Sequence, residues 1–491
     1  MKKASTHLFD LIRMLSASEK RYFQKYAKRH SNNSENQYLQ LFNAIALMQE
    51  YDETALRKQM KDTTIATHFA VTKRYLYEQV LDCLHHYHLN QRIEEKILKD
   101  LHLCKILLEK KLTQQAEKRI NACSILIEKH QLCAYSPILT QLKRRLLQTQ
   151  RQYKQEVLTK SEKEYTDRLM LLQKDSFYWL KSHEIIGLHL QKVKTLNEEQ
   201  KQRLELLVQQ LLEAGLPQTP RTRVDYLKAL ATYHFMKGEV SSAAKYNRDL
   251  LQLFENTSYL KSSEKEIYIA AYSNYLIDNH ILGRHKALEE GVQNLRLLSK
   301  NKTFKSIPNL EVRVFELTYS LQLNTRIKQN EFASALSLMP ELKALIGQYN
   351  NKIDINYQLS FGYLMAYIYY GNKRYEASLE QLEVLKNRAN KKLMEEMQYA
   401  ADRLLLINHL ALGNYRLLES MIDNIRRSHR NKAIKTQLED VFFKGLKKVI
   451  AAPNKSMRQE AFVQMKAGIL ALKKQEPRAW NYFNFDLWVL E

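Results

Sequence analysis

Residues that interrupt helices are scarce in this chain, and their scarcity is the strongest constraint on its fold. The 491 residues include only 11 glycines and 7 prolines, whereas these two types together make up roughly 12% of an average soluble protein. Sheets and tight hairpins need glycine, proline and asparagine at their turns, while helix interiors exclude glycine and proline. The composition therefore predicts an all-α protein with long helices and short connections.

Helix starts are indicated by capping residues along the whole chain. Four pairs have the spacing of a capping box: Ser16 with Glu19, Asn197 with Gln200, Ser263 with Glu266, and Ser456 with Gln459. Ser136 before Pro137 and Thr219 before Pro220 indicate two more starts, because proline suits the first helical position. Apolar residues between these starts recur at intervals of three and four, which favours helices over strands.

One pattern returns from about residue 224 onward. An apolar helix is followed by a short turn with Gly or Asn, an aromatic or apolar residue, a small residue three positions later, and another helix. Its copies are Gly238, Val240 and Ala243; Asn330, Phe332 and Ala335; Lys373, Tyr375 and Ser378; Gly413, Tyr415 and Leu418; and, more loosely, Gly283 and Ala287. A weaker copy contains Leu112 and Ala116. The small residue lets the second helix lie close against the first.

This pattern resembles the tetratricopeptide repeat family, whose helical hairpins place Gly, Tyr and Ala at this spacing. The resemblance is strongest over residues 224–253, although the copies here are longer than the roughly 34 residues of that family. It implies a superhelical array of antiparallel helix hairpins. We expect this array over residues 93–491, with capping helices at its C-terminal end, and a separate helical module over residues 1–92. Residues 15–23 resemble the opening of a bacterial group of such repeat proteins, and this likeness implies no activity.

The resemblance also nominates residues for a binding groove. In the tetratricopeptide family, the first helix of each hairpin lines a concave surface, and the positions of the turns here place six residues on it: Lys228, Asn324, Lys328, Tyr363, Tyr367 and Arg403. Lys and Arg suit a peptide carboxylate, Asn can pair with a peptide backbone, and Tyr can stack and hydrogen-bond. The alternative is that several of these side chains pack between hairpins.

Aromatic residues are concentrated at the C-terminal end. They are Trp480, Tyr482, Phe483, Phe485 and Trp488. We expect them to close the last hairpin, because the end of a helical array must cover an otherwise exposed core. A self-association surface is the alternative.

The N-terminal module contains a pattern that supports a second interpretation, DNA binding. Its apolar and small residues loosely follow a helix-turn-helix: Ile65, Ala66, Phe69, Ala70, Val71 and Leu76. Lys73, Arg74 and Tyr75 would then begin a recognition helix. Against this, Gln79 occupies a position that is normally apolar, and any pair of amphipathic helices can show the same spacing.

Motifs for catalysis are missing from the sequence. It has no glycine-rich phosphate loop, no nucleophile elbow and no metalloprotease motif. The densest set of metal-ligand types is Cys83, His85, His86 and His88, followed by His102 and Cys104. Its spacing matches no known zinc motif, and buried cysteines with solvated imidazoles are the alternative. We therefore expect no enzyme activity, no cofactor and no bound metal.

Charge and hydropathy limit the class of partner. The net charge of +24 is compatible with an acidic partner, although a solvated basic surface explains it equally. No apolar stretch approaches the roughly 20 residues that span a bilayer, and Asp10 and Arg13 interrupt any signal-peptide core. We expect a cytoplasmic scaffold or adaptor that binds a protein or peptide, without membrane insertion. The alternative is a transcriptional regulator. The sequence indicates no oligomeric state.

Overall fold

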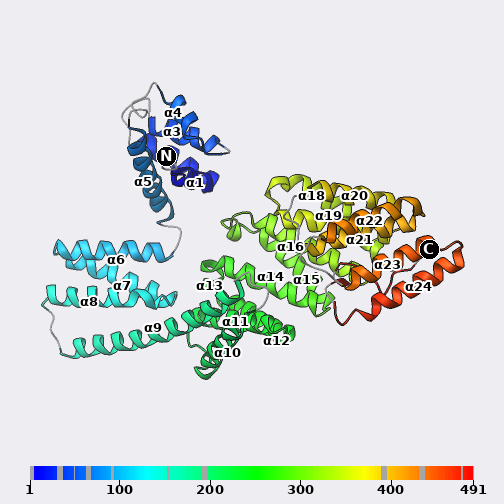
Figure 1. The fold of residues 1–491 in the computed structure, drawn as a ribbon. Helices are drawn as coiled ribbons and strands as arrows, with labels where there is room; N and C mark the ends of the chain where they lie inside the picture. Colours follow the sequence, from blue (N-terminus) through cyan, green and yellow to red (C-terminus); the bar gives the residue numbers. More distant parts are fainter. Residues whose placement is uncertain are drawn as a thin grey trace. The chain divides into compact units, whose positions relative to one another are not determined.

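Every regular element in the described part of the chain is a helix. The computed structural model describes residues 5–29, 37–48, 50–61, 68–89, 93–151, 155–190, 196–388, 395–430, 437–476, 479–480 and 482–489. Helices occupy most of these residues, and none of them forms a strand (Figure 1). The predicted all-α class is confirmed. Among the same residues, no helix combines the length and apolarity needed to cross a bilayer.

Contacts within the chain group it into two compact units. The first unit comprises residues 1–187, 198–226 and 257–263, and the second comprises residues 188–197, 227–256 and 264–491. The N-terminal module predicted over residues 1–92 thus shares a unit with later helices. Its apolar core, from Leu8 to Cys83, is nevertheless distinct from the core that extends from Ile97 to Leu146. The domain boundary at residue 92 stays a prediction.

Five helices enclose the N-terminal core. They are α1 His7–Met14, α2 Ala17–Arg29, α3 Gln37–Leu47, α4 Glu53–Gln59 and α5 Phe69–His88. The best-buried side chains of this core have no exposed surface: Ile12, Leu41, Phe42, Leu76 and Val80. They recur at helical spacing in α3 and α5, so each helix turns one apolar face inward.

The rest of the first unit begins with three stacked helices, α6 Ile93–Glu109, α7 Thr113–Lys129 and α8 Ser136–Thr149. Each contacts the other two (Figure 1). Left-handed residues reverse the chain after α6 and α7, at Lys111 (φ 60°) and Gln131 (φ 51°). Because both connections are reversals, α6 and α8 run in the same direction. The first unit also contains α10 Glu198–Glu213 and α13 Ser258–Ser263, with η1 Cys133–Tyr135 before α8. Two helices are divided between the units, α9 Gln155–Leu190 after Gly187 and α11 Pro220–Met236 after Tyr226.

The second unit is a series of helix pairs with a shared core. Its helices are α12 Val240–Asn256, α14 Lys265–Ile281, α15 His285–Lys300, α16 Leu310–Lys328, α17 Phe332–Ser337, α18 Met339–Tyr349, α19 Ile355–Gly371, α20 Tyr375–Arg388, α21 Glu395–Ala411, α22 Tyr415–Arg430, α23 Gln437–Ala451 and α24 Lys455–Ala471, with η2 Lys302–Phe304 and η3 Asn350–Lys352. One apolar cluster extends from Val312 to Trp488. The helices therefore bury apolar faces both within each pair and against neighbouring pairs.

The recurring turn has the geometry that the sequence pattern predicts. Gly238, Asn330, Lys373 and Gly413 all have a left-handed backbone, with φ between 58° and 76°. Five positions later stand the predicted small or apolar residues, and each is 0% exposed: Ala243, Ala335, Ser378 and Leu418. The weaker copy has the same geometry: Lys111 is left-handed, and Ala116, five positions later, is also 0% exposed.

One copy of the pattern has a different register. After the left-handed Gly283, the residue in the buried place is Leu288, which is 1% exposed, whereas Ala287 is only half-buried. The prediction of Ala287 was therefore wrong by one residue. One turn further along α15, Gly291 lies so close to Leu276 of α14 that an added Cβ would clash with its Cδ2.

Two predicted helix starts are confirmed. At α2, the Glu19 amide donates to Ser16 Oγ (3.3 Å) and the Ser16 amide donates to Glu19 Oε2 (2.7 Å), as in a capping box. At α11, Pro220 is the first helical residue, and Thr219 Oγ1 accepts from the Thr222 amide (3.2 Å). Both caps satisfy amides that lack a partner within the helix.

Two other predicted caps were wrong. The residue that caps α24 is Asn454, whose Oδ1 accepts from the Met457 amide (2.9 Å), so Ser456 lies inside the helix. The residue before α14 is Glu264, which makes no side-chain cap, and Ser263 ends α13. In each case a residue one or two positions away begins the helix, since the serine spacing alone does not identify the position that leaves helical geometry.

Candidate functional site

A non-helical stretch near the C-terminus, which contains turns, lies against α19. We call residues 482–489 the C-terminal segment. Tyr363 donates its hydroxyl to the carbonyl oxygen of Tyr482 (2.9 Å), and the amide of Asn484 donates to the hydroxyl of Tyr367 (2.9 Å). Both α19 tyrosines are buried. Two side chains nominated for the groove thus hold the backbone of a non-helical segment more than 100 positions away in the sequence.

Aromatic packing supports these two hydrogen bonds. The Phe483 ring stacks on Tyr367, with 5.2 Å between centroids, and also contacts Tyr370. Trp488 packs on Phe462 of α24 (4.8 Å between centroids), so the segment also covers the last hairpin. Aromatic residues of the C-terminal end thus pack on the last helix pair, as the sequence led us to expect. They extend further than expected, because they reach α19 as well.

Burial fixes the protonation of the two tyrosines. It raises the pKa of Tyr367 to about 12, and it raises the pKa of Tyr363 as well. Both hydroxyls therefore keep their protons at physiological pH, which lets Tyr363 act as a donor to a backbone carbonyl.

A cleft of about 300 Å³ opens beside the C-terminal segment, within the second unit. Its walls are α16, α19, Met397 of α21 and the chain after α24. The lining residues are Asn324, Ile327, Lys328, Ser360, Tyr363, Leu364, Tyr367, Met397, Lys473, Trp480, Tyr482, Asn484 and Asp486. Four of the six nominated residues are brought together here: Asn324, Lys328, Tyr363 and Tyr367.

Lys328 is the cation of this cleft that has no carboxylate partner. Its Nζ lies 3.3 Å from Nε2 of His280, its one polar contact among the described residues. Burial and the charge of Lys328 lower the pKa of His280 to about 4, so the imidazole is neutral at physiological pH. Partial desolvation also lowers the pKa of Lys328. The neutral imidazole adds no charge of its own, so the positive charge of Lys328 favours the approach of an anion.

The one carboxylate of the cleft is already neutralised. Asp486 accepts a hydrogen bond from Lys473 Nζ (2.8 Å) and another from Trp480 Nε1 (2.9 Å). The Lys473 bond, with the Trp480 bond, holds the pKa of Asp486 below its ordinary value. Asp486 therefore leaves the charge of Lys328 uncompensated.

The amide of Asn324 retains part of its hydrogen-bonding capacity. Its Nδ2 donates to the carbonyl of Ser320 in the same helix (2.8 Å). This bond orients the amide and leaves Oδ1 and a second N–H for a ligand.

Two nominated residues do not line the cleft. Arg403 is 5% exposed and forms an ion pair with Glu439, which joins α21 to α23. Its guanidinium therefore packs between helices, as the alternative interpretation had it. Lys228 is half-buried on α11 and lies outside the cleft lining.

Sequence reasoning did not nominate Lys473 and Asp486 of this cleft, or His280, which contacts Lys328. Lys473 and Asp486 follow the last copy of the turn pattern, so the pattern could not predict which surface they face. His280 lies in an earlier hairpin and reaches the cleft only through Lys328. The cluster of aromatic residues near the C-terminus was the one available signal, and it was interpreted as a cap.

The residues considered for metal binding are dispersed. Cys83 is buried in the core of α1–α5, and Cys104 in the core of α6–α8. His88 pairs with Glu19 (2.7 Å), and His86 contacts the carbonyl of Asp82. Among the described residues, no three side chains of metal-ligand type come together.

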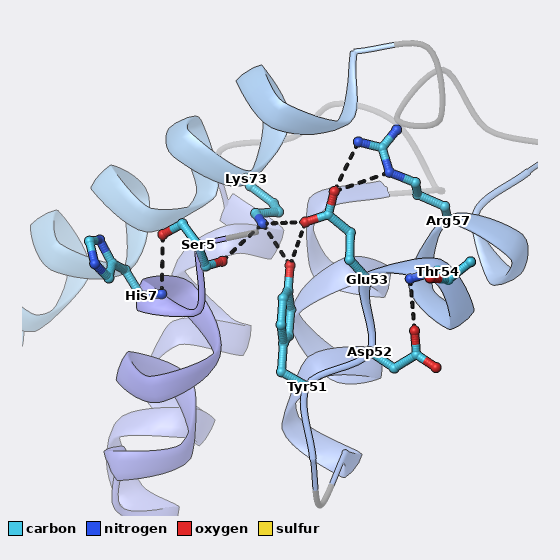
Figure 2. A network of polar contacts seen from close by, with 8 residues as sticks. All are labelled: Ser5, His7, Tyr51, Asp52, Glu53, Thr54, Arg57 and Lys73. Carbon is cyan, nitrogen blue, oxygen red and sulfur yellow. Dashed lines mark hydrogen bonds and ion pairs between the residues drawn. The ribbon is translucent and has the colours of Figure 1, made fainter. Parts of the chain in front are cut away.

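The cation proposed for DNA contact is held inside the N-terminal core. Figure 2 shows Lys73 Nζ donating to the carboxylate of Glu53 (2.8 Å), the hydroxyl of Tyr51 (2.6 Å) and the carbonyl of Ser5 (3.1 Å). Arg57 binds the other oxygen of Glu53. The hydrogen bond from Lys73 lowers the pKa of Glu53 to about 2.

The backbone around Lys73 differs from a helix-turn-helix. The helix α5 runs without a turn from Phe69 past Tyr75, so Lys73 does not begin a new helix. Arg74 and Tyr75 are exposed. The first two residues of the proposed motif, Ile65 and Ala66, lie outside the described residues.

Comparisons with known proteins add no family to this description. No protein-family model, curated protein or solved structure matches the chain.

Proposed function

We propose that this chain is a non-catalytic scaffold that binds an acidic peptide segment of another protein in the cleft beside the C-terminal segment. The observation that carries the proposal is Lys328, a cation without a carboxylate partner in a cleft whose remaining polar groups suit a peptide backbone. A carboxylate placed next to Lys328 would form a charge-assisted hydrogen bond, and these are about twice as strong as neutral ones.

The C-terminal segment supports the proposal as an internal example of the same recognition. Tyr363 and Tyr367 hold its backbone by hydrogen bonds, and Phe483 fills an aromatic site on α19. Binding of a peptide through bonds to its backbone together with pockets for its side chains is a general mode of recognition. A partner peptide would lie alongside this segment, where Asn324 and Ser360 offer further polar groups.

The hairpin geometry fits a tetratricopeptide-like array, which we include in the proposal. The left-handed turns with a buried residue five positions later recur in both units. In such an array each hairpin adds surface to its neighbours, so binding function does not require a buried reactive centre. A cytoplasmic location is part of the same proposal and rests on the sequence alone.

Peptide display on the immobilised full-length chain tests the proposal. We expect the selected peptides to be enriched in Asp and Glu and to bind at least about tenfold more weakly to Lys328→Glu, since reversing a charge beside a bound carboxylate removes attraction and adds repulsion. The matched control is Lys245→Glu, an exposed residue of α12 outside the cleft. Selection without acidic enrichment, or equal loss in both variants, would contradict the proposal.

The alternative, DNA binding by the N-terminal module, stays a prediction that no observation here favours. Of its two proposed cations, Lys73 is engaged with Glu53 and only Arg74 is exposed. The DNA-binding alternative would be supported if the chain bound duplex DNA at low salt and Arg74→Glu abolished this binding.

A further inference from the structure

A second surface, in the first unit, combines exposed apolar residues with exposed cations. It is a groove of about 410 Å³ between α6 and α8. Leu98 and Ile138 are 45% and 46% exposed there, while Leu101 and Leu142 form its buried floor. Large apolar side chains that share a groove and remain exposed are typical of a surface that a partner covers.

The two walls of the groove carry matching rows. On α6 the row is Leu98, Leu101, His102 and Lys105, and on α8 it is Ile138, Gln141, Leu142 and Arg145. Both rows have the spacing 0, 3, 4 and 7, which places each row on one helix face. Because α6 and α8 run in the same direction, the apolar ends of the rows coincide, and so do the cationic ends. The two ends lie about 10 Å apart, at 1.5 Å per residue.

The cationic end is available to a partner. Lys105 is exposed and makes no ion pair or hydrogen bond among the described residues. Arg145 has only a loose pair with Glu109 (3.9 Å), and both side chains are about half-exposed. Exposed pairs of this kind contribute little, so a ligand carboxylate can replace Glu109 at small cost. His102, also exposed, lies between the cations and the apolar end.

We propose that this groove binds an acidic amphipathic helix of a partner protein. A helix suits the two rows because residues at spacing 0, 3, 4 and 7 of a ligand helix also lie on one face and can follow them. Its apolar residues contact Leu98 and Ile138, and its carboxylates, two turns away, contact Lys105 and Arg145. Acidic residues are favourable in the first turn of a helix, so the ligand runs antiparallel to α6 and α8. The groove shares no residue with the cleft beside the C-terminal segment, so neither proposal depends on the other.

Fluorescence anisotropy with a designed probe tests this proposal on the full-length chain. The probe is a labelled helical peptide with glutamates in its first turn and leucines two turns later, and the reference peptide has the same composition with the glutamates moved to the last turn. We expect the probe to bind more tightly than the reference. The double variant Lys105→Glu with Arg145→Glu should weaken probe binding at least about tenfold, and so should Leu98→Ser with Ile138→Ser.

Two controls separate this surface from other causes. Lys118→Glu changes an exposed residue of α7 outside the groove, and Lys328→Glu changes the cleft of the second unit; both should bind the probe as the wild type does. Circular dichroism of each variant should be unchanged, because the substituted side chains are exposed. The proposal is overturned if the wild type does not bind the probe at low salt, if the reference binds equally well, or if the Lys105 and Arg145 double variant binds normally.

Discussion

At the scale of single residues, Lys73 shows how a charge that looks available in the sequence is used inside the fold. Its ammonium group makes three hydrogen bonds, and its side chain is only 13% exposed. No local sequence pattern predicts these hydrogen bonds, because Ser5, Tyr51 and Glu53 lie 68, 22 and 20 positions from Lys73. A cation with partners so distant in sequence cannot be distinguished from a surface lysine before the fold is known.

The Lys73 network predicts a local loss of stability when the ammonium is removed. Lys73→Met should destabilise the α1–α5 core by about 1–3 kcal/mol, since the partly buried Glu53 and Tyr51 lose their donor. Hydrogen exchange of α4 and α5 amides in the full-length chain should accelerate accordingly. The matched control, Arg74→Met, changes an exposed neighbour and should leave exchange nearly unchanged. Equal exchange in the two variants would contradict the network.

The depressed pKa of Glu53 predicts a pH dependence with a definite sign. Its carboxyl has a pKa of about 2 in the folded chain against an ordinary value of 4.5. A lowered folded-state pKa contributes stability that is fully present above about pH 4.5 and is lost as the pH falls toward 2. We therefore compare the hydrogen-exchange protection of α4 amides in the wild type and in Glu53→Gln. The difference between them should be constant from pH 8 to pH 5 and should shrink toward zero as the pH falls below 4.5. A difference that grows on acidification would contradict this assignment.

At the scale of helices and hairpins, the sequence was most informative where the chain reverses. A left-handed turn residue and a buried residue five positions later are both local requirements, so their spacing could be predicted from Gly238 and Ala243 onward. Caps were less predictable. Ser456 has the right spacing to Gln459, but Asn454 begins the helix instead.

Close packing within hairpins predicts opposite effects at two glycines. A Cβ on Gly445 of α23 would lie 2.6 Å from Met465 Cβ, whereas a Cβ on Gly347 of α18 would have nothing within 4 Å. Gly445→Ala should therefore destabilise the second unit by about 1–3 kcal/mol through overpacking. Gly347→Ala should stabilise it by about 0.5–1 kcal/mol, because alanine is the better helix former. Urea unfolding of both variants checks this, and a stabilised Gly445→Ala would refute the packing described for α23 and α24.

At the scale of the whole molecule, each unit contains one of the two surfaces that we propose as binding sites. The nominated groove residues were placed by turn position, and Asn324, Lys328, Tyr363 and Tyr367 do lie around one cleft. Arg403 was not predictable as buried, because its partner Glu439 belongs to a later hairpin. The position of the C-terminal segment could not be predicted from the sequence either, because its hydrogen bonds to α19 join residues 117 and 119 positions apart.

Photo-crosslinking from inside the cleft tests the central claim most directly. A photoreactive amino acid in place of Ser360, which lines the cleft, would be activated in an extract of the source cells, and crosslinked peptides would be sequenced. The account predicts crosslinks to an acidic segment of another protein, lost in Lys328→Glu and retained in Lys245→Glu. Crosslinks confined to the chain's own residues 479–489, unchanged by Lys328→Glu, would contradict it.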